Sequence, residues 1–591
     1  MPPLRRVRRV LRRGSPSRRL NVTLLCIAFV LSLFAARLVQ LQGLDWSTYR
    51  NLAQHQRVRK IPIPAVRGSI TSSDGKVLAM TVQTDLVFAD PVIIPAARRA
   101  AVASALAGPL GLPASQILTL INQPTSPQYV VLRQSVPAAT GSRITSLDLP
   151  GISETPSYSR VYPNGDLAAN LLGFTDTTAT GDLHGMAGLE YSENSLLAGK
   201  DGKEEVETGS QGQPIPLTQD LVRPEVPARS LRLTIQSDLQ WEAQQACEER
   251  VKLTRAQNCS VVIMQPRTGK ILAMAQWPEF SPADPPSVAS TTDIPVDDVF
   301  EPGSTAKVIT VAAALERGGQ TPMSAYTVPD HIVIDGFPFQ DAEIHPTLRY
   351  TIAGILANSS NVGMVQVVQH VSPSVQYHYF KKFGIGSVTG LGLPGETPGL
   401  LAPPSQWSGD TRYTLSFGQG VAVNAVQMAS VYATIANGGV RVAPSVIAGT
   451  TDGGGKFVPA ARPKRTRVLK AKTARQLMAM LQQVPQVDVE GGQPWGVIAG
   501  YSIAAKTGTA QLADPRKGGC LCEYGSSYIG IAPASDPQLV VAVHVEDPRT
   551  SDYFGDAVAG PVFNQVMKFA LQTMKIPPDG HKPPKERLIA P

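Results

Sequence analysis

Ser304-Thr305-Ala306-Lys307 opens the segment that decides the fold of this chain. It follows the turn-like string Phe300-Glu301-Pro302-Gly303, and the run from Ser304 to Arg317 has the composition of a helix that stops at Gly318-Gly319. Ser304 would then lie at a helix N-terminus, with Lys307 one turn further along the same face. Alone, this pattern fits either a serine cap beside a solvated lysine or a nucleophile beside its base.

Two further strings occur later in the chain in a suitable order. Ser359-Ser360-Asn361 follows Tyr350–Leu356, which we expect to be helical, and Lys506-Thr507-Gly508-Thr509 follows the strand-like run Val497–Ala505. Each string alone predicts no more than a polar turn. Together the three supply a nucleophile, a base, a proton relay and a clamp for a carboxylate, and this combination indicates acyl transfer.

The last string suggests how a substrate would be held. Lys506 supplies positive charge, and the hydroxyls of Thr507 and Thr509 can bind a terminal carboxylate. Gly508 would let a substrate backbone approach the strand closely. The backbone N–H groups of Ser304 and Thr509 are the expected oxyanion hole.

The N-terminal region predicts a membrane anchor. Eight arginines lie in the first nineteen residues, and without them the 54 basic residues fall to 46, equal to the 46 acidic ones. The basic pI therefore describes a tail and not a nucleic-acid-binding surface. Residues 20–42 are long and apolar enough to span a bilayer, and no small-x-small cleavage site follows them, which favours an anchor over a cleaved signal peptide. We expect residues 1–19 in the cytoplasm and everything from about residue 43 outside the membrane.

The rest of the chain divides into two domains of an α+β protein. Residues 43–208 carry short β-like runs, residues 209–228 are a Gly- and Pro-marked hinge, and residues 577–591 are expected to be disordered. In residues 229–576, a strand (Ser230–Ile235), a helix (Leu239–Leu253) and two buried strands (Val261–Met264 and Ile271–Ala275) precede the first motif. This order predicts an antiparallel sheet flanked by helices.

Four of the five cysteines would be exported, so disulfides could persist. Cys247, Cys259, Cys520 and Cys522 allow three pairings, and free thiols remain an alternative. Their spacing resembles no zinc site, and no His-Glu-x-x-His string occurs. We therefore expect no metal and no other cofactor.

The three strings match the S-x-x-K, S-x-N and K-T-G set of the penicillin-binding and β-lactamase superfamily. Nearly end to end, the chain resembles class B penicillin-binding proteins, which are membrane-anchored D,D-transpeptidases of bacterial cell walls. The strings that carry this resemblance are Arg67-Gly68-Ser69-Ile70, Arg160-Val161-Tyr162-Pro163, Gly188-Leu189-Glu190, Glu301-Pro302-Gly303-Ser304, Ser416-Phe417-Gly418-Gln419-Gly420, Lys506-Thr507-Gly508-Thr509 and Ser527-Tyr528-Ile529-Gly530.

The resemblance implies an elongated, β-rich pedestal followed by a transpeptidase domain that acts through a serine acyl-enzyme. Ser304 would attack the D-Ala-D-Ala carbonyl of a stem peptide, and Lys307 is the expected base, although the base is disputed in this superfamily. Ser359 would pass a proton to the leaving amine, and Asn361 would hold Lys307 and bind the substrate backbone. β-Lactams would acylate Ser304, and hydrolysis of the acyl-enzyme would give a carboxypeptidase side activity.

The resemblance also implies partners and leaves alternatives open. A polytopic membrane glycosyltransferase and other divisome proteins are the expected partners, beside the bacterial inner membrane. A septal role in cell division is favoured over a role in elongation by the Arg-rich tail and the compact pedestal. A membrane-bound β-lactamase or β-lactam sensor would share the same strings. A purely scaffolding protein, which activates the glycosyltransferase without catalysis, is the remaining alternative.

Overall fold

The structure is a computed structural model, and it describes residues 15–48, 58–63, 65–124, 126–177, 182–207, 220–286, 291–514 and 520–591. The chain forms two compact units: residues 1–65 with 200–226, and residues 66–199 with 227–591. Most of the predicted basic tail and residues 209–219 of the predicted hinge lie outside the described residues. The domain bounds drawn from the sequence stay predictions.

The first unit contains the apolar helix and a small sheet. Helix α1 (Pro16–Val39) runs into a π-helical turn, Gln40–Leu44, and none of its residues is buried by protein. The helix of residues 16–44 is long and apolar enough to cross a membrane. It includes the predicted span at residues 20–42. The sheet is antiparallel in the order β1-β8-β9: β1 (Val58–Ile63), β8 (Gly202–Glu207) and β9 (Asp220–Arg223).

In the second unit, strands from the two halves of the chain form one seven-stranded sheet. Parallel pairing of β10 with β2 joins the strands before residue 200 to those after residue 227. The strands are β2 (Ile70–Thr71), β3 (Val77–Ala89), β4 (Val130–Pro137), β5 (Ile152–Val161), β10 (Ser230–Leu233), β18 (Ile447–Thr451) and β19 (Phe457–Pro459). The pedestal and transpeptidase segments therefore share main-chain hydrogen bonds, which the predicted hinge did not indicate.

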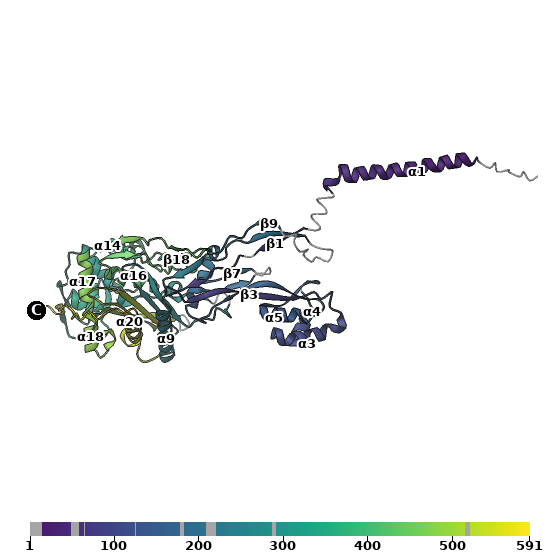
Figure 1. The fold of residues 1–591 in the computed structure, drawn as a ribbon. Helices are drawn as coiled ribbons and strands as arrows, with labels where there is room; N and C mark the ends of the chain where they lie inside the picture. Colours follow the sequence, from purple (N-terminus) through teal and green to yellow (C-terminus); the bar gives the residue numbers. More distant parts are fainter. Residues whose placement is uncertain are drawn as a thin grey trace, which may run out of the picture. The chain divides into compact units, whose positions relative to one another are not determined.

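Three helices and several short elements complete the region before residue 200. Helices α3 (Arg99–Leu110), α4 (Ala114–Asn122) and α5 (Ala138–Thr145) bury apolar side chains against β3 and β4 in a core of their own (Figure 1). The short elements are α6 (Ala169–Leu172), β6 (Thr175–Thr177), β7 (Leu183–Gly185), α7 (Gly188–Ser192) and α8 (Asn194–Leu197).

The part of the second unit that carries the three predicted catalytic strings is built on a five-stranded antiparallel sheet in the order β12-β11-β23-β22-β21. The strands are β11 (Asn258–Met264), β12 (Ile271–Trp277), β21 (Ala504–Asp514), β22 (Cys520–Ala532) and β23 (Leu539–Glu546). Consecutive residues of β23 alternate between two cores: Leu539 and Val541 pack with helices α9 and α20, whereas Val540 and Ala542 face the core around α11 and α16. This alternation is what a strand buried on both faces requires. The predicted sheet with helices on both sides is confirmed.

The elements around this sheet position the motifs. They are α9 (Ser237–Thr254), α10 (Ile294–Asp297), the 3₁₀ turn η4 (Gly303–Ala306), α11 (Lys307–Arg317), α12 (Ile352–Ala357), α13 (Asn361–Val368), α14 (Pro373–Phe383), α15 (Thr411–Thr414), α16 (Ala425–Ala436), α17 (Ala471–Leu481), α18 (Val484–Glu490), α19 (Gly555–Val558) and α20 (Gly560–Thr573), with the hairpins β13–β16 (Ala325–Val328, Leu348–Thr351), β14–β15 (His331–Ile334, Phe337–Gln340) and β17–β20 (Val440–Val442, Arg465–Arg467).

Three local predictions differ from the structure. Tyr350 lies in strand β16, which ends at Thr351, and helix α12 begins at the next residue, where the Thr351 side chain caps it by accepting a hydrogen bond from Gly354 N. The strand that carries Lys506 begins only at Ala504, because a turn in which Tyr501 N donates to Ile498 O interrupts the predicted run. Residues 577–591 are not disordered: Ala590 N donates to Arg349 O, and Asp579 accepts hydrogen bonds from Ser502. Backbone hydrogen bonds, the Asp579 carboxylate and the single apolar side chain of Leu588, rather than a hydrophobic pattern, hold this segment, so its composition gave no signal.

Candidate active site

Ser304 is the second residue of η4, the 3₁₀ turn that leads directly into α11. Ser304 is half-buried and lines a cleft with a volume of about 460 Å³, whereas Lys307 is the first residue of α11 and is fully buried. The first helical turn is 3₁₀ and not α, a small departure from the predicted helix. Ser304 and Lys307 thus lie about one turn apart in one helical segment, as their spacing predicts.

Close backbone packing fixes the turn before Ser304. Gly303 has φ +51°, its N donates to Gly418 O at 3.1 Å, and a Cβ at Gly303 would lie 2.7 Å from Thr509 O. A Cβ at Gly418, which has φ +86°, would lie 2.0 Å from Gly303 O. Side chains at either position would push the Ser304 turn away from β21.

Lys307 reaches the second motif. Its Nζ donates to Asn361 Oδ1 at 2.8 Å, to Ser359 Oγ at 3.3 Å and to the backbone oxygen of Ser359. Burial, and then the nearby Lys506 ammonium, hold the pKa of Lys307 well below its usual range, while Asp341 opposes this shift. A lysine that is held partly neutral can accept the proton of a serine.

Ser359 connects the two lysines. It adopts φ +58°, a strained conformation for a residue with a side chain. Its Oγ accepts a hydrogen bond from Lys506 Nζ at 2.9 Å and lies 3.3 Å from Lys307 Nζ. Both lysines therefore converge on one hydroxyl, which is the geometry that a proton relay needs.

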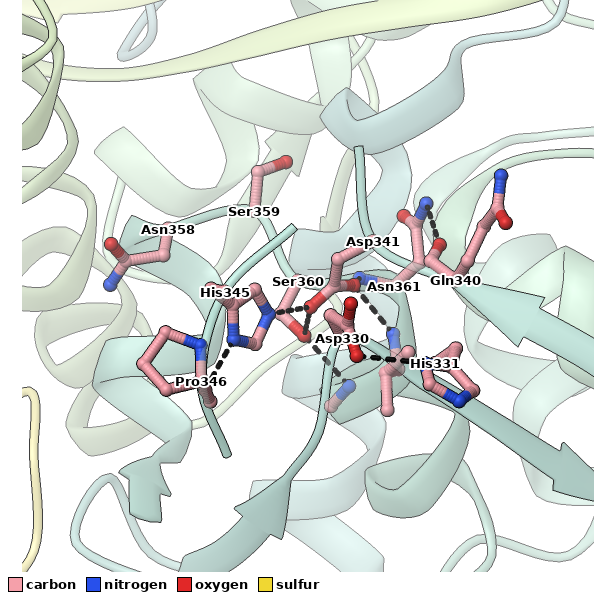
Figure 2. A network of polar contacts seen from close by, with 12 residues as sticks. Asp330, His331, Gln340, Asp341, His345, Pro346, Asn358, Ser359, Ser360 and Asn361 are labelled. Carbon is pink, nitrogen blue, oxygen red and sulfur yellow. Dashed lines mark hydrogen bonds and ion pairs between the residues drawn. The ribbon is translucent and has the colours of Figure 1, made fainter. Parts of the chain in front are cut away.

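Ser360, between the two predicted catalytic residues, has a structural role. It caps α13 by accepting a hydrogen bond from Gly363 N at 2.9 Å, and its hydroxyl donates to Asp341 Oδ2 at 2.6 Å. Asp341 Oδ1 also accepts from Asn361 N at 2.5 Å and from Val362 N at 2.9 Å. Figure 2 shows Asp341 between Ser360 and Asn361, with His345 on its other side. A carboxylate at a helix N-terminus is favourable, and this one fixes the S-x-N motif.

Lys506 is held in a second buried network. Burial lowers the pKa of Lys506 to about 8, although the carboxylates of Asp488 and Asp556 favour its charged form. Burial likewise raises the pKa of Asp488 to about 7, and Tyr528 donates to its Oδ2 at 3.1 Å. The sequence singled out neither Asp488 nor Asp341, because each lies in a segment without a recognisable string.

Residues of the K-T-G string lie on both faces of strand β21. Thr507 and Thr509 line the cleft with Ser304, Ser359 and Asn361, as predicted for a carboxylate clamp. Gly508 packs against the Ser304 turn: a Cβ there would lie 2.8 Å from Thr305 Cγ2 and 2.9 Å from Pro302 O. Its predicted role in letting a substrate backbone approach the strand stays a prediction. Its missing side chain lets the Ser304 turn pack against β21, since alternate residues of a strand face opposite sides.

The cysteines and the acidic side chains complete the description. Cys247 on α9 and Cys259 on β11 form a disulfide, one of the pairs that the sequence left open. Within the described ranges, no group of three His, Cys, Asp or Glu side chains is arranged to hold a metal ion.

Two family matches cover most of the chain. Residues 259–568 match the penicillin binding protein transpeptidase domain, and residues 62–233 match the penicillin-binding protein dimerisation domain. The chain belongs to the class B penicillin-binding proteins. The dimerisation-domain match covers the segment predicted to form the pedestal, and the transpeptidase match contains all three catalytic strings.

Relatives and solved structures agree with this assignment. The chain is 34% identical to penicillin-binding protein PbpB of Mycolicibacterium smegmatis, over 94% of this chain and 90% of that protein. It is 32% identical to the peptidoglycan D,D-transpeptidase FtsI of Escherichia coli K12, over 94% of this chain and 91% of that protein. The structure of Mycobacterium tuberculosis penicillin binding protein 3 complexed with aztreonam matches with a TM-score of 0.69 and 29% identity, over 90% of this chain and all of that one.

Proposed function

We propose that the protein is a serine-type peptidoglycan D,D-transpeptidase that cross-links stem peptides during septal cell-wall synthesis and is inhibited by β-lactams. One observation carries the proposal: two buried lysines, Lys307 and Lys506, converge on Ser359 Oγ next to the cleft that Ser304 lines. The names of the relatives, which include PbpB and FtsI, support the septal assignment.

The first half-reaction forms an acyl-enzyme. Ser304 Oγ attacks the carbonyl carbon of D-Ala-D-Ala while its proton passes to Lys307 Nζ. The bond from this carbon to the nitrogen of the last D-alanine then breaks, and the nitrogen takes a proton through Ser359 Oγ. The backbone N–H groups of Ser304 and Thr509 stabilise the developing oxyanion.

The second half-reaction forms the cross-link. An amine of a neighbouring stem peptide attacks the ester at Ser304 and loses its proton to the same relay, and Ser304 leaves with a proton restored. Water in place of the amine gives the carboxypeptidase side activity. A β-lactam follows the first half-reaction only, because opening its ring releases no leaving group.

Strand β21 is suited to hold the peptide. It is the outer strand of the five-stranded sheet, so one of its two sides has no neighbouring strand within that sheet. An extended stem peptide can lie along this side with its carboxylate at Thr507, Thr509 and Lys506, in the manner of an added strand. Asn361, held by Lys307, is positioned to bind the peptide backbone.

The proposed setting is the outer face of a bacterial inner membrane. Helix α1 crosses the membrane once, the arginine-rich segment before it stays in the cytoplasm, and the catalytic part lies outside. A polytopic membrane glycosyltransferase that supplies glycan strands, together with other divisome proteins, would bind through the span and the pedestal.

Labelling with a fluorescent penicillin tests the proposal. Full-length protein in detergent and its Ser304→Ala variant would be incubated with the probe and followed over time. We expect a lasting adduct on the wild type alone. An adduct that decays within seconds would indicate a β-lactamase, and a folded wild type that forms no adduct would contradict the enzymatic proposal and favour a scaffold.

A further inference from the structure

His345 occupies a defined place beside the S-x-N motif. It lies in the loop between β15 and β16 and lines the catalytic cleft, and 18% of its side chain is exposed. Its Nε2 is 3.0 Å from Asp341 Oδ2, and its Nδ1 is 2.8 Å from Pro346 O (Figure 2). No role was predicted for this residue from the sequence.

Both ring nitrogens of His345 face acceptors. A carboxylate oxygen and a backbone carbonyl oxygen accept hydrogen bonds and cannot donate them. A neutral imidazole has one N–H group and can satisfy only one of the two, whereas an imidazolium satisfies both. The geometry therefore fits the charged form of the ring.

The charges around the ring favour the same form. Partial burial opposes the charge, but the hydrogen bond to Pro346 O and the carboxylate of Asp341 outweigh it, and the pKa of His345 is raised. The second charged group that acts on the ring is Asp330, which is also acidic. Tyr350 packs edge-on to the ring at 6.2 Å, and Glu343 lines the same cleft. Among the described residues, no lysine or arginine acts on the ring to disfavour its charge.

Asp341 transmits this contact to the reacting groups. Only 7% of its side chain is exposed, and its two oxygens bind Ser360 Oγ, Asn361 N and Val362 N as well as His345. Asn361 in turn accepts from Lys307. The Asp341 carboxylate also favours the charged form of Lys307, and an imidazolium beside Asp341 weakens that effect.

We propose that His345, as an imidazolium, is a positioning residue for acylation. It holds the Asp341 carboxylate against the N-terminus of α13 and thereby keeps Asn361 and Ser359 hydrogen-bonded to Lys307. The inference rests on the proposed function, because it concerns the rate at which Ser304 is acylated. As pH rises and the ring loses a proton, one of its two hydrogen bonds is lost and the Asp341 carboxylate loses its neighbouring positive charge. Acylation then slows.

Substitutions at His345 separate a positioning role from a merely structural one. Full-length protein in detergent would be acylated with a fluorescent penicillin at acidic, neutral and alkaline pH, and the second-order rate constant measured. We expect His345→Ala to be about 10-fold slower than wild type at pH about 6, from loss of a charge-assisted contact. His345→Arg keeps the charge and offers several N–H donors, so it should retain the wild-type rate to within about threefold.

The pH profile gives the decisive comparison. The ratio of the wild-type rate to the His345→Arg rate should fall as pH rises, because only the histidine loses its proton, while changes at Lys307 and Lys506 cancel in the ratio. His331→Ala is the matched control: His331 is a neighbouring histidine that pairs with Asp330, and 80% of its side chain is exposed. We expect this control to behave as wild type.

Three outcomes would overturn the inference. The first is that His345→Ala is acylated at the same rate as His331→Ala at every pH. The second is that His345→Arg is acylated as slowly as His345→Ala. The third is that the ratio of the wild-type rate to the His345→Arg rate does not change with pH. Thermal unfolding of each variant shows whether it is folded, and if His345→Ala is not, the arginine variant and its pH ratio still decide. Failure of wild-type protein to be labelled at Ser304 would instead contradict the proposed function.

Discussion

Two clusters of buried positive charge lie in the second unit, and they are built differently. In the segment before residue 200, Arg67 and Arg160 contact opposite oxygens of Glu190, each through Nε at 2.7 Å, and all three side chains are at most 2% exposed. In the active site, Lys307 and Lys506 are equally buried, but among the described residues neither forms an ion pair with a carboxylate.

The difference indicates what each cluster is for. A buried charge that touches its counter-charge stays charged and fixes local geometry. A buried ammonium whose nearest carboxylates act only from a distance has a lowered pKa, as both lysines do. The first arrangement stabilises the fold, and the second makes an amine that can exchange a proton near neutral pH.

Replacing Lys307 should have the largest effect on the rate of acylation and almost no effect on the melting temperature. We expect Lys307→Met to slow acylation of Ser304 by about 1,000-fold or more, since the serine loses its base. Its melting temperature should change little, because removal of a buried ammonium offsets the loss of its hydrogen bonds to Asn361 and Ser359. Penicillin labelling and thermal unfolding measure the two quantities.

Lys568→Met, on the exposed face of α20, is the control for this experiment and should change neither quantity. A large loss of stability in Lys307→Met would show that the active-site cation is structural, as in the Arg67 cluster, and the comparison would fail.

The opposite result is expected for the carboxylate of the first cluster. Glu190→Gln leaves two buried guanidinium groups without a counter-charge and should destabilise the protein by about 3–5 kcal/mol. Chemical denaturation of the full-length protein measures this change. Glu193→Gln, three residues later and less buried, should cost little. Equal stability of the two variants would contradict the structural role of the Arg67–Arg160–Glu190 cluster.

In the His345→Arg variant, where residue 345 does not titrate, the pH dependence of acylation should report the two lysines. The rate should rise with pH as Lys307 loses its proton, and it should fall above pH about 8, where Lys506 loses the charge that holds a carboxylate. On this alkaline limb the acylation rate should fall about tenfold for each pH unit. A rate that continues to rise well above pH 8 would show that the charge of Lys506 is not required.

The smallest expected effect concerns Asp488. Its carboxylate favours the charged form of Lys506 without contacting it, so Asp488→Asn should lower the pKa of Lys506 and move the alkaline limb to lower pH by up to about one unit. The shift is read from the same rate profile. A limb that moves to higher pH, or does not move, would mean that Asp488 does not act on Lys506. Asp536→Asn, on an exposed residue outside the cleft, is the control.

The sequence could predict the groups that lie on recognisable strings. Ser304, Lys307, Ser359, Asn361, Lys506, Thr507 and Thr509 do meet around one cleft, because helix and strand periodicity determine which of these side chains share a side. The sheet order with helices on both faces followed from the strand–helix–hairpin pattern before the first motif.

The supporting groups could not be predicted in this way. Asp341 lies 20 residues before Asn361, and Asp488 lies 40 residues before Tyr528, so only tertiary packing brings each pair together. The packing of Gly508 against Thr305 and Pro302 could not be predicted either, because a strand pattern does not say which face meets another element. The C-terminal segment is held by hydrogen bonds of its backbone and of Asp579, which the composition of the segment does not indicate.

The pairing of β10 with β2 bears on how the catalytic part can be produced by itself. A fragment that starts near residue 229 keeps β10 but removes β2, and it strips Leu231 of the apolar neighbours Ile70 and Leu78. The freed backbone groups would form an open ladder that a second fragment can pair with, which is a route to aggregation. Fragments that retain residues 66–199 should stay monodisperse where shorter ones do not.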